Sequence, residues 1–112
     1  MRFYKVHGLG NDFILFDARN RRLDWHRLAP RLCDRHFGIG ADGLLLLETG
    51  QKVPFKMRII NADGSEAEMC GNGIRCFAKY LADHSYIPAD QDELEVETLA
   101  GIQRVRLIRR GG

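Results

Sequence analysis

The residues with the clearest chemical potential lie in the segment 61–77, where Cys70 stands between a loop of small polar residues and a predicted helix. A cysteine acts as a base or nucleophile through its thiolate. A helix N-terminus favours the thiolate through unpaired N–H groups and a partial positive charge. The same N–H groups can bind a carboxylate. One turn can therefore supply both a general base and an anion site. The alternative is that Cys70 is a small buried residue that precedes a helix.

Two asparagines, Asn11 and Asn61, lie next to predicted tight turns. A side-chain amide can donate to a carboxylate and accept from an ammonium group, so both asparagines are candidates for substrate binding. The alternative is that each is a turn former, because asparagine closes Asx-turns and tolerates the left-handed conformation. Asp42 and Asp63 have the same two interpretations: turn formation, or acceptance of hydrogen bonds from residues that contact a ligand. For both we favour turn formation.

The other thiols and the histidines are expected to be structural. Cys33 lies on the apolar stripe of one predicted helix, and Cys76 lies inside another. The cysteines and histidines lack C-x-x-C or H-x-x-x-H spacing, so no metal site is expected. The histidines are His7, His26, His36 and His84, and we expect structural or solvent-exposed positions for them.

The segment 38–43 matches G-x-G-x-x-G, but its context does not fit a nucleotide site. A dinucleotide-binding loop follows a strand and opens a helix. Here a predicted helix precedes the glycines and a strand follows them. We therefore interpret the segment as a loop that needs the conformational freedom of glycine, with a role in lining a site as the second choice.

The length of 112 residues favours one domain, 1–112, and the net charge of +2 indicates no particular partner. The N-terminus has no apolar signal-peptide region, and no apolar run approaches the ~20 residues of a membrane helix. An odd number of cysteines without framework spacing favours free thiols and a cytoplasmic location. Nucleic-acid binding is not expected, because no aromatic platform accompanies the basic end of the chain. Its arginines are Arg104, Arg106, Arg109 and Arg110.

Hydrophobic periodicity predicts an α+β domain of about six strands and two helices. The first helix starts at an N-cap, Asp24, and ends near His36; Pro30 should kink it or lie in its first turn. The second runs from about 71 to 84, and its apolar face is formed by Ile74, Phe77, Ala78 and Leu81. Strands are expected at 3–7, 12–17, 44–48, 55–61, 94–98 and 102–109. The run Leu44–Leu47 should be a buried strand.

Three segments together resemble the N-terminal half of diaminopimelate epimerases. They are Lys5 to Phe13, Arg35 to Gly43, and above all Asn61 to Cys76, which contains Asn-Ala-Asp-Gly-Ser-Glu and Cys-Gly-Asn-Gly. The resemblance implies a strongly curved mixed or antiparallel sheet wrapped around a central helix. It also implies a cofactor-independent isomerase that interconverts L,L- and meso-diaminopimelate, on the route to lysine and the bacterial cell wall.

The resemblance also assigns residues. Two cysteines face opposite sides of the substrate α-carbon, one removing a proton as thiolate and the other delivering a proton as thiol. Cys70 corresponds to one of them. Asn11 and Asn61 correspond to substrate contacts, as do Gly71 and Asn72, whose N–H groups would bind the α-carboxylate. Some family members carry glutamine at the position of Gly43, and a glycine cannot make that side-chain contact.

The main departure from the family is length. Family members have two similar domains, each of which supplies one cysteine, and a final segment that returns to the first domain. The second cysteine turn is absent here, so we expect a complementary C-terminal domain or self-association to complete the enzyme. The alternatives are a non-catalytic truncated domain of the same fold and a related proline racemase-like epimerase.

Overall fold

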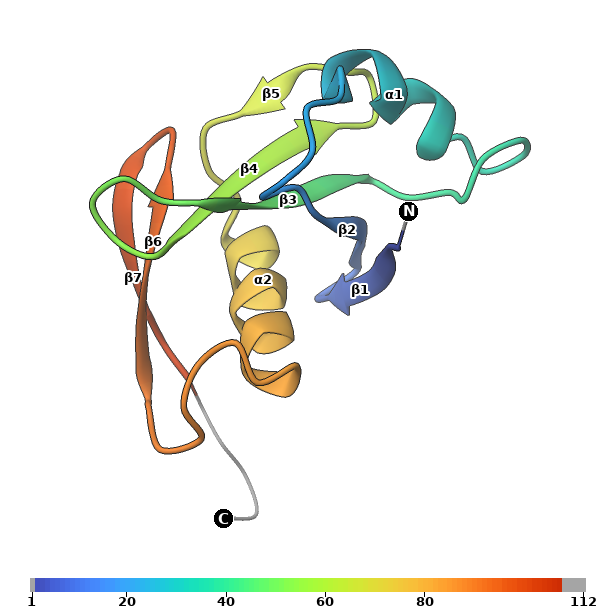
Figure 1. Ribbon diagram of the computed structural model, residues 1–112. Coiled ribbons are helices and arrows are strands. Elements are labelled where there is room, and N and C mark those ends of the chain that lie inside the picture. Colours follow the sequence, from blue (N-terminus) through green and yellow to red (C-terminus); the bar gives the residue numbers. More distant parts are fainter. Residues whose placement is uncertain (1, 108–112) are drawn as a thin grey trace.

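Four consecutive leucines, Leu44–Leu47, form the middle of β3 (Gly43–Thr49), and all four are fully buried in the computed structural model, which describes residues 2–107. Successive side chains of a strand point to opposite faces, so this run needs cover on both. Leu45 and Leu47 belong to the apolar cluster that contains α2 (Gly71–Asp83), whereas Leu44 and Leu46 belong to the cluster that contains α1 (Trp25–Leu32). Figure 1 shows the two helices on opposite sides of β3. The predicted buried strand is confirmed.

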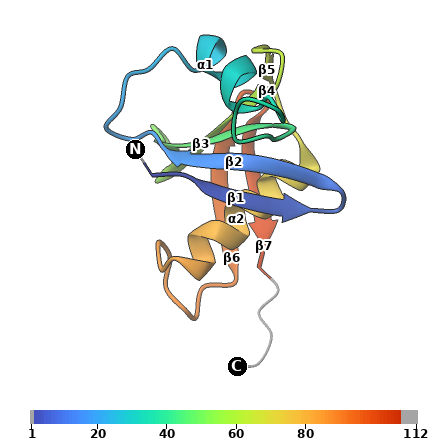
Figure 2. The same ribbon diagram turned by 90° about the vertical axis from the view of Figure 1, so that its right-hand side faces the viewer.

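Within residues 2–107 the strands form one mixed sheet in the order β1-β2-β3-β4-β6-β7, with β5 paired to β4 off this path. The β2–β3 and β4–β6 pairs are parallel, and the others are antiparallel. In Figure 2, β1 and β2 lie side by side and the β6–β7 hairpin runs steeply across their direction. The predicted α+β class is confirmed at this level. The remaining strands are β1 (Tyr4–Gly8), β2 (Asn11–Asp17), β4 (Phe55–Asn61), β5 (Glu66–Ala67), β6 (Glu93–Thr98) and β7 (Gly101–Arg106).

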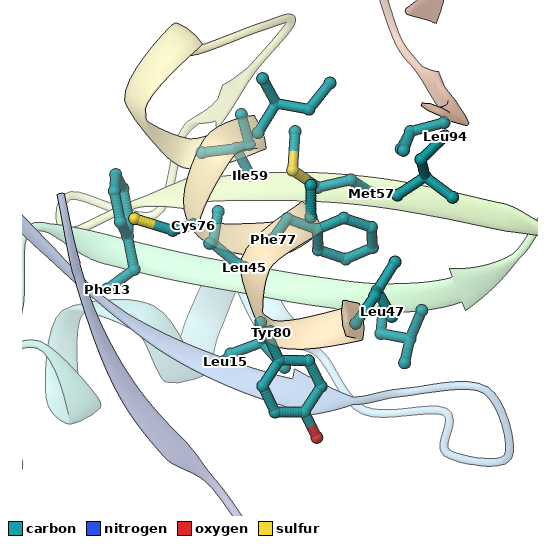
Figure 3. Packing of buried hydrophobic residues seen from close by; sticks show 14 of the residues in the cluster. Phe13, Leu15, Leu45, Leu47, Met57, Ile59, Cys76, Phe77, Tyr80 and Leu94 are labelled. Carbon is teal, nitrogen blue, oxygen red and sulfur yellow. The ribbon is translucent and has the colours of Figure 1, made fainter. Parts of the chain in front are cut away.

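The apolar face of α2 packs where its periodicity predicts. Ile74, Phe77, Ala78 and Leu81 are all buried, and the helix contacts β1, β2, β4 and β7. Phe77 has no exposed surface, and Figure 3 shows its ring between the helix and the side chains of Met57 and Leu47. Burial of a phenylalanine side chain contributes about 1.5–3 kcal/mol. The helix that carries Cys70 at its start is therefore fixed by the main core.

The first helix is shorter than predicted. Asp24 is its N-cap, as expected, and accepts from the Arg27 N–H, but the helix ends at Leu32 and not near His36. The chain turns back there: the N–H groups of Ile39 and Gly40 both donate to the Leu32 carbonyl. Pro30 lies in the second turn of the helix and not in the first. Backbone hydrogen bonds from the loop that follows the helix thus end it before its local pattern does.

Two strand predictions need correction. The two-residue strand β5 was not predicted, and it makes seven strands in the described part of the chain against about six expected. The second correction concerns the last strand, which was expected at 102–109: β7 starts at Gly101 and ends at Arg106. On β7 Arg104 and Arg106 are exposed while Val105 packs inward, which confirms the predicted alternation. Arg109 and Arg110 lie outside the described residues.

Candidate active site at the N-terminus of α2

Cys70 is the N-cap residue of α2. Its backbone is extended, with φ −145° and ψ 118°, and its carbonyl accepts the first helical hydrogen bond, from Ile74, at 2.9 Å. The Gly73 N–H donates to Cys70 Sγ across 3.4 Å. The thiol is half-buried and lies against the positive end of the helix dipole. The predicted position of Cys70 between loop and helix is confirmed.

Gly71 and Asn72 form the first turn of α2, where backbone N–H groups have no partner inside the helix. Gly71 is exposed, and a Cβ placed on it would meet no atom within 4 Å. A ligand can therefore approach this turn closely. Such N–H groups bind carboxylates, which is the chemistry expected of them from the sequence.

Asn11 and Asn72 meet although they are 61 residues apart. Asn72 Nδ2 donates to Asn11 Oδ1 across 2.7 Å. Asn11 is the first residue of β2 and pairs with Gly8 on β1. A Cβ on Gly8 would lie 2.7 Å from Cys76 Sγ, so this glycine allows the end of β1 to approach α2 closely. The structure thus brings Asn11 to the helix turn that follows Cys70.

Asn61 is the last residue of β4 and lies opposite Gly43, at the end of the sheet where β2 begins. Its side chain makes a local hydrogen bond. Asn61 Nδ2 donates to Ser65 Oγ at 3.1 Å, and its backbone closes the same turn through bonds to Gly64 and Ser65. This bonding fits the turn-forming alternative. A Cβ on Gly43 would lie 2.8 Å from the Ile60 carbonyl oxygen, so this backbone leaves no room for a side chain at Gly43.

A charged group of Lys5, Asp12, Arg35 and Asp42 lies beside Asn11, and Asp42 accepts a hydrogen bond from the Asn11 side chain. Sequence reasoning gave no role to the first three and favoured turn formation for Asp42. Asp12 pairs with Lys5 at 2.8 Å and with Arg35 at 2.9 Å, and these two cations hold the pKa of Asp12 well below its usual range, with the Arg35 hydrogen bond as the largest cause. Arg35 also pairs with Asp42 at 3.1 Å. The available signal was that all four residues lie in the first two family-like segments.

The other two thiols are buried, as predicted. Cys33 is 4% exposed at the end of α1, and Cys76 is 5% exposed inside α2. Burial raises the pKa of both thiols. Among residues 2–107 no group of three or more potential metal ligands is found. In the same part of the chain no helix is long and apolar enough to cross a membrane.

We expect Cys70 to be alkylated faster than Cys33 and Cys76 at neutral pH. Cys70 is half-buried at a helix N-terminus, whereas burial disfavours the thiolate of the other two. Peptide mass spectrometry after brief treatment with iodoacetamide measures this order. Circular dichroism of the labelled sample shows whether unfolding has exposed all the thiols. Equal labelling of the three thiols in folded protein would contradict the prediction.

The fold is shared with solved structures of other proteins at low sequence identity. A PhzF-family phenazine biosynthesis protein of Bacillus anthracis matches 95% of this chain and 36% of its own, with a TM-score of 0.71 and 20% identity. A hydroxyproline epimerase from Agrobacterium vitis matches 91% of this chain and 35% of its own, with a TM-score of 0.68 and 16% identity. These two likenesses establish the fold class alone.

The family is established by sequence. The family model for diaminopimelate epimerase matches residues 3–112, and the chain belongs to this family. Diaminopimelate epimerases of Caldanaerobacter subterraneus subsp. tengcongensis and Moorella thermoacetica are 55% and 54% identical over the whole chain. That of Carboxydothermus hydrogenoformans is 59% identical over 91% of it. The chain spans about 40% of the length of these relatives. The proline racemase-like alternative therefore describes a distant relative.

Proposed function

We propose that this chain is the N-terminal half of a cofactor-independent epimerase that interconverts L,L- and meso-diaminopimelate. Family membership supports the reaction, and the position of Cys70 at the start of α2 is the structural observation that carries it. In this proposal the Cys70 thiolate removes the α-proton from one face of the substrate, or the thiol returns a proton to that face. A positioned general acid or base contributes roughly 10²–10⁴-fold to a rate.

Four other residues bind the substrate in this proposal. The N–H groups of Gly71 and Asn72 hold the α-carboxylate, and they stabilise the charge that develops when the α-carbon loses its proton. Asn11 contacts the substrate beside this turn, which it also supports through its bond to Asn72. Asn61 contacts the substrate from the end of β4, which requires its side chain to exchange the bond to Ser65 for one to the ligand.

Inversion also needs a second acid on the opposite face of the substrate. Cys33 and Cys76 are buried in apolar clusters, so neither is proposed for that role. We propose that a complementary C-terminal domain supplies the second cysteine. A groove of about 920 Å³ between α2 and β7 supports the proposal of such a partner. Its apolar lining includes Met69, Ile74, Ala78, Val105 and Leu107.

The domain bounds, the curvature of the sheet and the cellular location belong to the same proposal. We propose that residues 1–112 form one domain, whose sheet curves around α2 as its central helix. The contacts of α2 with strands from both ends of the sheet, β1 and β7, support this. A cytoplasmic location is supported by three cysteines that are all free.

Growth of a bacterium that lacks its own diaminopimelate epimerase tests this function. Co-expression of the chain with a polypeptide that carries the complementary domain should restore growth without added meso-diaminopimelate. The matched control replaces Cys70 with alanine in the same pair and should not restore growth. Failure of the unmodified pair, with both polypeptides present in soluble form, would favour a non-catalytic domain.

A further inference from the structure

Asp42 touches several of the elements that form the candidate site. Its Oδ2 accepts from the Asp12 N–H at 3.0 Å and from Asn11 Nδ2 at 3.3 Å. Its backbone links the same regions, because its N–H donates to the Asp12 carbonyl and its carbonyl accepts from the Ala62 N–H, next to Asn61. Asp42 thus joins the start of β2 to the end of β4.

The bonds of Asp42 determine which way two amides point. An ionised carboxylate only accepts hydrogen bonds, so Asn11 must turn its Nδ2 toward Asp42. Asn11 Oδ1 then faces Asn72. Because this oxygen can only accept, Asn72 must donate to it through Nδ2, and the distance from Asn72 Nδ2 to Asn11 Oδ1 is 2.7 Å. Asn72 Oδ1 is left as the end of this relay, and it accepts no hydrogen bond from residues 2–107.

We propose that Asp42 is a positioning residue. As a hydrogen-bond acceptor it fixes the direction of the relay Asp42–Asn11–Asn72. It thereby presents Asn72 Oδ1 as an acceptor beside the N–H donors of the first turn of α2. An amino acid carries an ammonium donor and a carboxylate acceptor on the same carbon. The relay therefore supplies the acceptor that complements the N–H groups. Only the identity of this ligand rests on the proposed epimerase function.

A purely electrostatic role for Asp42 is the competing explanation. Asp42 pairs with Arg35, but the two side chains are 39% and 57% exposed. Ion pairs at such exposure contribute little, and Arg35 makes two further hydrogen bonds to Asp12. Because the bonds to Asn11 and to the Asp12 N–H need an acceptor and not a charge, asparagine can replace aspartate in them, whereas alanine cannot.

Side-chain amide exchange in the purified chain, followed by NMR, separates these roles without any substrate. We expect Asp42→Ala to speed exchange of the Asn11 and Asn72 side-chain amides about tenfold, the effect of losing one hydrogen bond. Asp42→Asn should speed it about threefold or less, since a neutral acceptor keeps roughly half the strength of a charged one. Asp34→Ala is the matched control, because Asp34 accepts from His36 and Phe37 in the same loop and does not touch the relay.

Equal exchange in Asp42→Ala and Asp42→Asn would overturn the proposal, as would an unchanged rate in Asp42→Ala. The wild-type chain offers a second test that survives even if the alanine variant does not fold. A scalar coupling across the hydrogen bond should connect Asn72 Nδ2 to the Asn11 side-chain carbonyl carbon. Coupling in the reverse direction, from Asn11 Nδ2 to the Asn72 carbonyl carbon, would contradict the proposed direction of the relay. Since neither test involves diaminopimelate, their outcome is independent of the epimerase assay.

Discussion

Replacing Cys70 with alanine should lower the epimerisation rate of the chain paired with its complementary domain by about 10²–10⁴-fold, the usual contribution of a positioned acid or base. The substitution removes the Sγ atom that accepts from Gly73 and leaves the buried face of α2 intact. Loss of an N-cap acceptor costs about 1 kcal/mol of stability, so the variant should remain folded. Chiral separation of the L,L and meso isomers gives the rate, and circular dichroism confirms the fold.

Cys33→Ala is the matched control for this prediction. Cys33 is a buried thiol in the cluster on the other side of the sheet, so its loss should leave the rate within a few-fold of the original value. A Cys70→Ala pair that keeps its rate would remove Cys70 from the mechanism. A variant that loses its folded signal would show that Cys70 is mainly structural.

Replacing Phe77 with alanine should lower the free energy of unfolding of the chain by about 3–5 kcal/mol. Phe77 is fully buried in the cluster that joins α2 to the sheet, and its truncation removes most of an aromatic ring from a closely packed core (Figure 3). Because α2 positions Cys70 and Asn72, the variant should also lose the order of the candidate site. Urea unfolding followed by circular dichroism measures the change.

Lys79→Ala provides the comparison on the same helix. Lys79 is exposed and forms an i,i+4 ion pair with Asp83 at 3.0 Å, which contributes about 0.3–0.5 kcal/mol. Its replacement should therefore change stability much less than that of Phe77. A Phe77→Ala variant with less than about 1 kcal/mol of destabilisation would mean that α2 is not held by this core.

Local patterns predict much of the fold because they reflect burial. Phe55, Met57 and Ile59 alternate, as one face of a strand must, and all three join the core beneath α2. The apolar spacing of α2 and the extent of β4 follow from the same reasoning. The C-terminal end of α1 does not, because it is set by bonds from Ile39 and Gly40 that the helix's own residues do not reveal.

The candidate site is predictable in position but not in connectivity. The loop-to-helix junction at Cys70 is visible in the sequence because glycine and small polar residues precede an apolar period. The bond between Asn11 and Asn72 is not, since it depends on β1 reaching α2 past Gly8. The charged group around Asp12 is hidden for the same reason: its members come from two separate segments, and their spacing resembles that of ordinary surface residues.

The most direct test of the central claim is the fate of the α-hydrogen in heavy water. The claim is that Cys70 serves one face of the substrate and that a complementary domain serves the other. The paired polypeptides should convert L,L-diaminopimelate to the meso isomer with solvent deuterium at the inverted carbon, while this chain alone should give no meso product. Meso product carrying deuterium from this chain alone would contradict the account, because one thiol cannot reach both faces, and would indicate that a second copy supplies the opposing thiol.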